Sequence, residues 1–234
     1  MLFLFPSFTV IYAIAACLAL VSAAAVFERK SNPGYFHFSL CLISLFTWSF
    51  AAIFEAGALS VAGKIYWSGW QYLGVVTMAP HWFLFSADYA NKRILKSSWL
   101  KYLIWVIPAV TLVFVFSDQL NHYLRTYVDI PIDSVNHIAI YGHGFWFYVH
   151  LIYSYLLFLT GTFWLVQTLL RKPKENRTPA IVIIASFVIG WVANLIYVMG
   201  KSPIPGLDLT SISFIFIAVV LTWMIFNKRL FNLV

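Results

Sequence analysis

Residues 65–90 read IYWSGWQYLGVVTMAPHWFLFSADYA, a run of mostly apolar residues that is long enough to cross a bilayer as a helix. The run also contains polar and aromatic residues that a plain membrane anchor does not need, among them Trp67, Trp70, Gln71 and His81. Polar groups inside a membrane are costly and usually face protein or water. We therefore predict that this run is the central helix of a bundle and that one of its faces lines a cavity.

The rest of the chain is equally apolar. Hydrophobic residues make up 62% of the 234 positions and charged residues 10%, whereas a soluble domain has about 25% charged residues. The apolar residues form runs that occupy the whole length, so we predict a single all-α membrane domain over residues 1–234, with no separate soluble domain. The seven predicted transmembrane helices are Leu4–Phe27, Tyr35–Phe54, Ile65–Tyr89, Leu100–Phe116, Phe145–Leu170, Pro179–Met199 and Leu209–Phe226.

Lysine and arginine indicate how the bundle is oriented. Three of the 15 basic residues, Lys64, Arg125 and Lys201, lie in one set of links, and the other twelve lie in the opposite set or at its helix ends. Basic residues accumulate on the cytoplasmic side, so the N-terminus is expected outside and the C-terminus inside. The net charge of +7 is therefore a topology signal, and we expect the lipid bilayer rather than nucleic acid as the partner.

The longest link, residues 117–144, falls on the external side. It holds two β-prone stretches, Tyr123–Ile130 and Val135–Tyr141, on either side of the turn sequence Pro131–Ser134. This pattern predicts an extracellular β-hairpin between the fourth and fifth helices. The hairpin is either a spacer or a lid over an outward-facing cavity.

Several polar and aromatic side chains are expected near the outer ends of the helices. Glu55 closes the second helix, where it is either solvated at the headgroups or faces Lys64 or a cationic ligand group. Asp208 opens the seventh helix, where it either caps the helix or faces the same cavity. The predicted ligand-binding residues are Glu55, Trp67, Trp70, Gln71, His81, Asn194, Tyr197 and Asp208.

Three of these residues also have simpler explanations. His81 follows Pro80, and Pro80 predicts a kink in the helix. There are two interpretations of His81. In the first it titrates or binds ligand, and in the second it is hydrogen-bonded to a neighbouring helix. Asn194 needs a polar partner, which is another helix or a ligand. Tyr197 is otherwise a residue of the interfacial aromatic belt.

Known catalytic patterns are missing from the sequence. The six histidines show no metal-ligand spacing, and no phosphate-binding glycine loop or nucleophile motif occurs. The last predicted helix has no lysine that could hold retinal as a Schiff base. We therefore expect neither enzymatic activity nor a metal or cofactor.

The order of several short motifs carries a family resemblance. These are Trp48 and Glu55; Lys64, Trp67 and Tyr72-Leu73-Gly74; Ala79-Pro80 with Trp82, Phe85 and Tyr89; Asn121-His122; Tyr141-Gly142 with Phe145-Trp146; Pro205 with Leu207-Asp208-Leu209-Thr210; and Arg229-Leu230-Phe231. Through them the chain resembles the N-terminal seven-helix region of bacterial sensor histidine kinases over nearly its whole length.

The resemblance implies a multi-pass sensor domain of the bacterial inner (plasma) membrane. In that family the seventh helix continues into a cytoplasmic output module such as a kinase, which we expect as a partner beyond Val234. Dimers are usual for sensor kinases, so a homodimer is also expected. The function that we predict is detection of a small-molecule ligand from outside or from the membrane.

Three other functions are possible on the sequence. A small transporter is expected to show internal repeats and polar residues through its full depth, and an intramembrane hydrolase to show clustered catalytic groups. A purely structural or dimerising anchor does not explain Glu55, Gln71 and Asn194 together. If Glu55 binds ligand, Glu55→Gln is expected to weaken binding without unfolding the protein.

Overall fold

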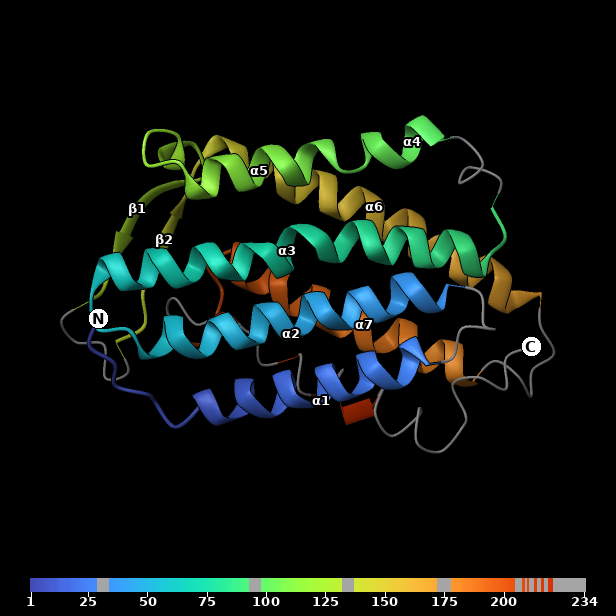
Figure 1. Cartoon of the computed structure of the whole chain (residues 1–234), viewed down its shortest axis with the longest axis horizontal. Coiled ribbons are helices and arrows are strands. Elements are labelled where there is room, and N and C mark those ends of the chain that lie inside the picture. Colours follow the sequence, from blue (N-terminus) through green and yellow to red (C-terminus); the bar gives the residue numbers. More distant parts are fainter. Residues whose placement is uncertain are drawn as a thin grey trace.

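The structure is a computed structural model. It describes residues 1–28, 34–92, 98–131, 137–171 and 178–204, together with Asp208, Thr210, Ser213, Phe216, Val219 and Val220. Long helices dominate it and lie side by side along the long axis of the molecule (Figure 1). They are α1 (Thr9–Phe27), α2 (Tyr35–Gly57), α3 (Val61–Tyr89), α6 (Phe145–Leu170) and α7 (Thr178–Val198).

Four stretches of helix are long and apolar enough to cross a membrane. They are Thr9–Phe27, Tyr35–Gly57, Phe145–Leu170 and Ile181–Val198. These helices confirm the predicted class of a mostly helical membrane protein, whereas a bundle of seven transmembrane helices stays a prediction. The seventh predicted helix, Leu209–Phe226, lies largely outside the described residues; the members of it that are described, Thr210, Ser213, Phe216, Val219 and Val220, are all helical.

The first helix begins later than predicted. Its first residue is Thr9 rather than Leu4, because the chain before it is extended and pairs with the link between α2 and α3. Phe3 forms a β-bridge with Ala58, and the backbone N–H of Leu4 donates to the carbonyl of Gly57 at 2.8 Å. Pro6 has no backbone N–H to donate, and its carbonyl accepts from the N–H of Thr9 at 3.0 Å. The helix therefore starts just after it.

The fourth predicted helix is two helices, α4 (Ser98–Leu103) and α5 (Val106–Phe116). Pro108 explains the break, since its nitrogen has no hydrogen to donate to the carbonyl of Ile104. The hydroxyl of Tyr153, on α6, donates to this carbonyl instead. A side chain from another helix thus satisfies the backbone group that proline leaves free.

The predicted hairpin is present with different bounds. Its strands are β1 (Arg125–Asp129) and β2 (Ile140–His143), which pair antiparallel and follow a short 3-10 turn at Asn121–Tyr123. The register pairs Arg125 with His143 and Val128 with Tyr141, with an irregularity between them. The second strand thus begins five residues later than the predicted Val135–Tyr141. In Figure 1 the hairpin and the N-terminus lie at the same end of the molecule.

The helix α3 is the centre of the bundle, as residues 65–90 predicted. It is 29 residues long, starts at an N-cap where Ser60 Oγ accepts from the Gly63 N–H, and continues through Pro80. It packs against α2, α5 and α6. Contact with α2 is very close at Gly74, where a Cβ atom would lie 2.4 Å from the carbonyl oxygen of Ser44.

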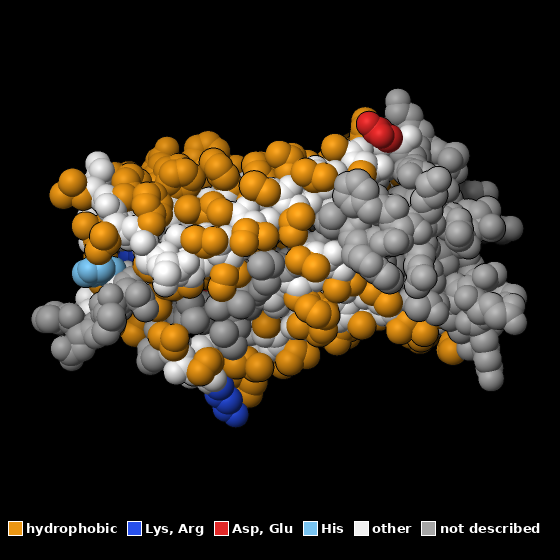
Figure 2. Space-filling view, turned by 90° about the horizontal axis from the view of Figure 1, so that it is seen from below, with side chains coloured by type: hydrophobic (Ala, Val, Ile, Leu, Met, Phe, Trp, Pro, Cys, Tyr) orange, Lys and Arg blue, Asp and Glu red, His pale blue; other side chains and the backbone are white. Residues whose placement is uncertain are grey.

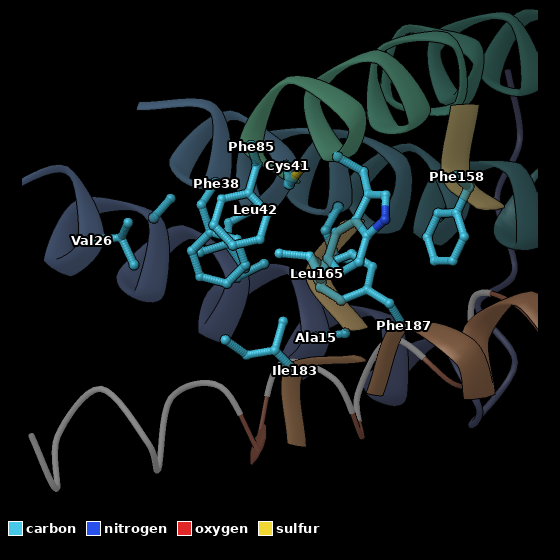
Figure 3. Packing of buried hydrophobic residues seen from close by; sticks show 14 residues of the cluster. Ala15, Val26, Phe38, Cys41, Leu42, Phe85, Phe158, Leu165, Ile183 and Phe187 are labelled. Atoms are coloured by element: carbon cyan, nitrogen blue, oxygen red, sulfur yellow. The ribbon is translucent and has the colours of Figure 1, made fainter. Parts of the chain in front are cut away.

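The apolar core lies where α1, α2, α3, α6 and α7 meet. The fully buried Trp82 of α3 packs face to face with Phe158 and against Phe187, at ring-centroid distances of 5.0 and 4.1 Å. Its indole N–H donates to Thr162 Oγ1. Figure 3 shows the neighbouring cluster, in which Phe38 and Phe85 stand together and Phe158 and Phe187 lie apart from that pair.

The outer surface is largely hydrophobic. Figure 2 shows hydrophobic side chains spread along one face of the molecule, with few charged groups among those coloured. On α6 the residues Ile152, Leu156, Leu159 and Phe163 are all exposed and recur every three to four positions. Such a stripe on one helix face suits contact with lipid tails.

Candidate functional site: a cavity beneath the hairpin

A cavity of about 210 Å³ lies inside the bundle. One water occupies about 30 Å³ in the liquid, so the cavity has room for a small organic molecule. Its wall comes from every long helix and from the hairpin, and includes Tyr12, Glu55, Lys64, Gln71, Arg125, Tyr141, Phe158, Phe187, Asn194 and Asp208. The polar wall residues of α2, α3 and β2 cluster toward the hairpin.

Glu55 and Lys64 form an ion pair in this wall. Lys64 Nζ is 3.8 Å from Glu55 Oε1, and the lysine side chain is fully buried. The same ammonium donates to the backbone carbonyls of Glu55 and Ala56, at 2.8 and 3.2 Å. These carbonyls belong to the last turn of α2, where a cation is favoured by the helix dipole. Lys64 therefore joins the start of α3 to the end of α2.

Tyr141 attaches the hairpin to this pair. Its hydroxyl donates to Glu55 Oε1 at 2.8 Å, and the carbonyl of Lys64 lies 3.4 Å away. Burial, followed by the charge of Glu55 and the hydrogen bond to it, raises the pKa of Tyr141 well above its usual value. The phenol therefore stays protonated and remains a donor. Through Tyr141, β2 is tied to both α2 and α3.

Arg125 is the second cation of the cavity wall. It begins β1 and is only 7% exposed. Its guanidinium donates to Ser68 Oγ at 2.9 Å and to Asn121 Oδ1 at 3.3 Å, and it lies over the rings of Tyr72 and Tyr141. All of these partners are neutral. From the sequence, Arg125 was interpreted only as a topology signal, because nothing in a linear sequence shows that this loop residue is buried.

A chain of hydrogen bonds links α6, α7 and the residues that follow α7. Tyr155 Oη donates to Asn194 Oδ1 at 2.9 Å, and Asn194 Nδ2 donates to Thr210 Oγ1 at 3.2 Å. The backbone N–H of Thr210 donates to Asp208 Oδ1 at 2.8 Å. Other protein side chains thus supply the polar partner that Asn194 requires. Asp208 acts as a helix cap, which is the first of its two predicted roles.

The structure brings five of the eight predicted ligand residues together. Glu55, Gln71, Asn194, Tyr197 and Asp208 all line the cavity. Whether any of them binds a ligand remains a prediction. Their common location is a consequence of tertiary packing, since they come from α2, α3, α7 and the segment after it.

The three remaining predicted ligand residues lie outside the cavity wall. Trp67 stacks on Phe54, with ring centroids 4.4 Å apart. Trp70 is 41% exposed and contacts Tyr66 and Phe116, which places it on the outside of the bundle. A sequence shows which residues share a helix but does not show how that helix is rotated in the bundle.

His81 packs between helices. Its Nδ1 lies 3.4 Å from Nδ1 of His37 on α2, and its ring meets the edge of Trp105 at the α4–α5 break. This arrangement agrees with the alternative in which His81 is hydrogen-bonded to a neighbouring helix. In the part of the chain that the structure describes, no three metal-ligating side chains are grouped to hold an ion.

Two histidines line the cavity, His150 of α6 and His143 of the hairpin. His143 lies flat against Phe147, with ring centroids 3.8 Å apart, and lines the cavity. Burial lowers the pKa of His143 below its usual value. The neutral imidazole therefore predominates at pH 7, and His143 adds no positive charge to the cavity.

These features define a helical membrane protein with a cavity capped by a hairpin. The family model of the N-terminal 7TM region of histidine kinase matches residues 11–234, and the chain belongs to this family. It is therefore a membrane sensor input region of two-component signalling, whose family places it with a cytoplasmic kinase module. No curated protein matches the chain.

Proposed function

We propose that this sensor region detects a small molecule that binds in the cavity beneath the hairpin, on the outer side of the membrane. The observation that carries the proposal is the cavity itself, because its polar end holds buried charged groups from α2, α3 and β1. Buried ionisable groups in a membrane protein mark functional sites by default. The hairpin acts as the lid, since Tyr141 and Arg125 reach from it into the wall.

Signal transmission follows from the hydrogen bonds at Asn194. This residue lines the cavity and donates to Thr210, which belongs to the helical residues after α7. A ligand that binds better to one position of Asn194 also favours one position of Thr210. Such a difference in affinity is what allows a ligand to shift the equilibrium between two arrangements of the helices. The last helix then passes the change to the cytoplasmic module.

Occupancy of the cavity can be tested with two matched alanine variants. Ala52 lines the cavity and is buried, whereas Ala24 is exposed on α1. Ala52→Leu should fill part of the cavity, and Ala24→Leu should leave it unchanged. The purified chain in lipid nanodiscs is melted with 4-phenylbutanol, 4-phenylbutylamine, 4-phenylbutyrate or phenylalanine, which share one apolar group and differ in charge.

We expect at least one of these compounds to raise the melting temperature by about 2 °C or more in the parent chain and in Ala24→Leu. The same compound should have little effect on Ala52→Leu, because the added side chain occupies its site. Equal shifts in both variants, or no shift with any compound, would show that the cavity is not a ligand site.

A further inference from the structure

The cavity wall holds two cations, Lys64 and Arg125, and two acidic groups, Glu55 and Asp208, and among the described residues Arg125 forms no ion pair with either acidic group. Lys64 and Glu55 neutralise each other at 3.8 Å. Asp208 accepts from the N–H of Thr210 at the start of a helical stretch, where the peptide dipoles favour a negative group. Arg125 is different, because its hydrogen-bond partners within the described residues, Ser68 and Asn121, are neutral.

A buried cation without an anion is costly. A guanidinium stays charged at any physiological pH, so Arg125 cannot lower this cost by losing its proton. It also carries more N–H donors than its two hydrogen bonds use. Arg125 is 7% exposed, lines a cavity and has N–H donors that its hydrogen bonds to the described residues do not use, so it can accept one further partner.

The surroundings of the guanidinium define the shape of that partner. The guanidinium carbon lies over the rings of Tyr72 and Tyr141, at 5.2 and 5.9 Å from their centroids. Cation–π contacts occupy the faces of the group, and its N–H donors point outward in its plane. A planar carboxylate meets such an edge with two parallel hydrogen bonds.

The remainder of the cavity is apolar and aromatic. Phe158, Phe187 and Trp191 line it together with Leu45 and Met78. Such a wall favours a hydrocarbon or aromatic body and disfavours a second charge. A molecule that matches this cavity therefore carries one anionic group for Arg125 and one apolar group for the aromatic wall.

We propose that the stimulus is a small apolar monocarboxylate, whose carboxylate binds Arg125 and whose aromatic or branched aliphatic body packs against Phe158, Phe187 and Trp191. This inference rests on the proposed function, because it assigns a chemical class to the ligand of the same cavity. Arg125 then has a second role besides tying the hairpin to α3, since ligand binding supplies its missing counter-charge. The closed position of the hairpin is favoured when the carboxylate is present.

The test compares the affinities of 4-phenylbutyrate, 4-phenylbutanol and 4-phenylbutylamine by calorimetry on the full chain in lipid nanodiscs. We expect the carboxylate to bind about tenfold or more tightly than the alcohol, and the amine to bind weakest. Arg125→Gln should bring the carboxylate down to the affinity of the alcohol, and Arg125→Lys should keep part of the difference. Arg171→Gln, which removes an exposed arginine at the end of α6, should change nothing.

The possible results separate this inference from the proposed function. If the alcohol binds as tightly as the carboxylate, and Ala52→Leu still abolishes binding, the cavity is a ligand site but the carboxylate assignment is wrong. If no compound binds, both proposals fail. If the Arg125→Gln variant unfolds, the Arg125→Lys variant decides. Lysine has a shorter reach and a different geometry, so it cannot reproduce bidentate binding. An unchanged preference for the carboxylate in Arg125→Lys would therefore contradict bidentate binding by Arg125.

Discussion

At the scale of single residues, the ion pair of Lys64 and Glu55 has a structural role that its position in the sequence does not reveal. Lys64 is fully buried and contacts three oxygen atoms of α2, namely one carboxylate oxygen of Glu55 and the backbone carbonyls of Glu55 and Ala56. Removing one partner of a buried pair leaves the other charge without compensation. The pair therefore affects stability as well as any ligand.

Lys64→Met should lower the free energy of unfolding by about 3–5 kcal/mol, because it leaves the partly buried carboxylate of Glu55 with Tyr141 as its one donor among the described residues. Lys201→Met, which removes an exposed lysine, should change it by less than about 0.5 kcal/mol. Equilibrium unfolding in mixed micelles measures both values. A similar small effect of the two substitutions would contradict a structural role for the pair.

This role also changes the expectation for Glu55→Gln. The amide keeps an oxygen that accepts from Tyr141, but it removes the anion that faces Lys64 at 3.8 Å. A loss of stability must therefore accompany any loss of binding. The expectation that Glu55→Gln weakens binding without unfolding the protein stays a prediction, to which the geometry around Lys64 adds a loss of stability.

At the scale of elements, the break between α4 and α5 shows how one helix completes another. Pro108 removes the donor for the carbonyl of Ile104, and the hydroxyl of Tyr153 on α6 replaces it. His81 of α3 contacts Trp105 at the same break. The three helices are thus coupled at a site where the backbone of one of them is interrupted.

Tyr153→Phe should destabilise the chain by about 1–2 kcal/mol, because the carbonyl of Ile104 then lacks a partner inside the bundle. The loss should be smaller in a Pro108→Ala background, where residue 108 regains an N–H that can donate to Ile104. A double-mutant cycle on unfolding free energies measures this coupling. Tyr148→Phe, at an exposed position of the same helix, is the control.

Additive effects of Tyr153→Phe and Pro108→Ala would mean that the two residues do not serve the same carbonyl. A large effect of Tyr148→Phe would show that the hydroxyl groups of α6 act by some other route. The predicted coupling is specific because it joins one proline, one carbonyl and one phenol on two different helices.

At the scale of the whole molecule, the arrangement of helices fits the topology that the basic residues predict. The N-terminus and the hairpin lie at one end (Figure 1). The helix α6 has 26 residues, about 39 Å at 1.5 Å per residue, so it is long enough to place its end at Arg171 on the opposite side of a bilayer from the hairpin. The exposed stripe of α6 contains no charged residue in between.

Two single-cysteine variants test this topology in intact cells. Tyr127 is exposed on the hairpin and Arg171 is exposed at the other end of α6. A membrane-impermeant maleimide should label Tyr127→Cys in intact cells and Arg171→Cys only after lysis, provided that Cys17 is first replaced by alanine. Cys41 is buried and can remain. The reverse labelling pattern would place the hairpin in the cytoplasm and would exclude an external ligand at this cavity.

Most of the helix positions could be predicted from the sequence, because hydrophobic runs and bilayer thickness are local properties. The predicted bounds of α6 agree with the structure, and those of α2 and α7 differ by only one to three residues at their ends. The helix α3 begins at Val61, before the predicted Ile65. The other errors lie near Pro6 and Pro108, where a proline without an N–H stands beside a helix start or a break inside an apolar run. Hydrophobicity alone does not detect such a break.

The candidate site was predictable only in part. Glu55, Gln71 and Asn194 stood out because polar groups are rare in membrane helices, and the structure places them in one wall. Arg125 was missed because it lies in a loop, where a charge usually needs no explanation. Trp70 was included as one of the unusual aromatic residues of the run 65–90, although it lies on the outside.

The amino-acid sequence is sufficient to define a membrane bundle, its expected orientation and its family, because these depend on hydrophobic length, charge distribution and short motifs. The tertiary structure decides which polar residues meet. Only packing turns Glu55 toward Lys64 and Tyr141, and only the fold of the hairpin buries Arg125 between Tyr72 and Tyr141. The physical reason is that a cavity is formed by residues distant along the chain, and their rotation about each helix axis depends on the neighbouring helices.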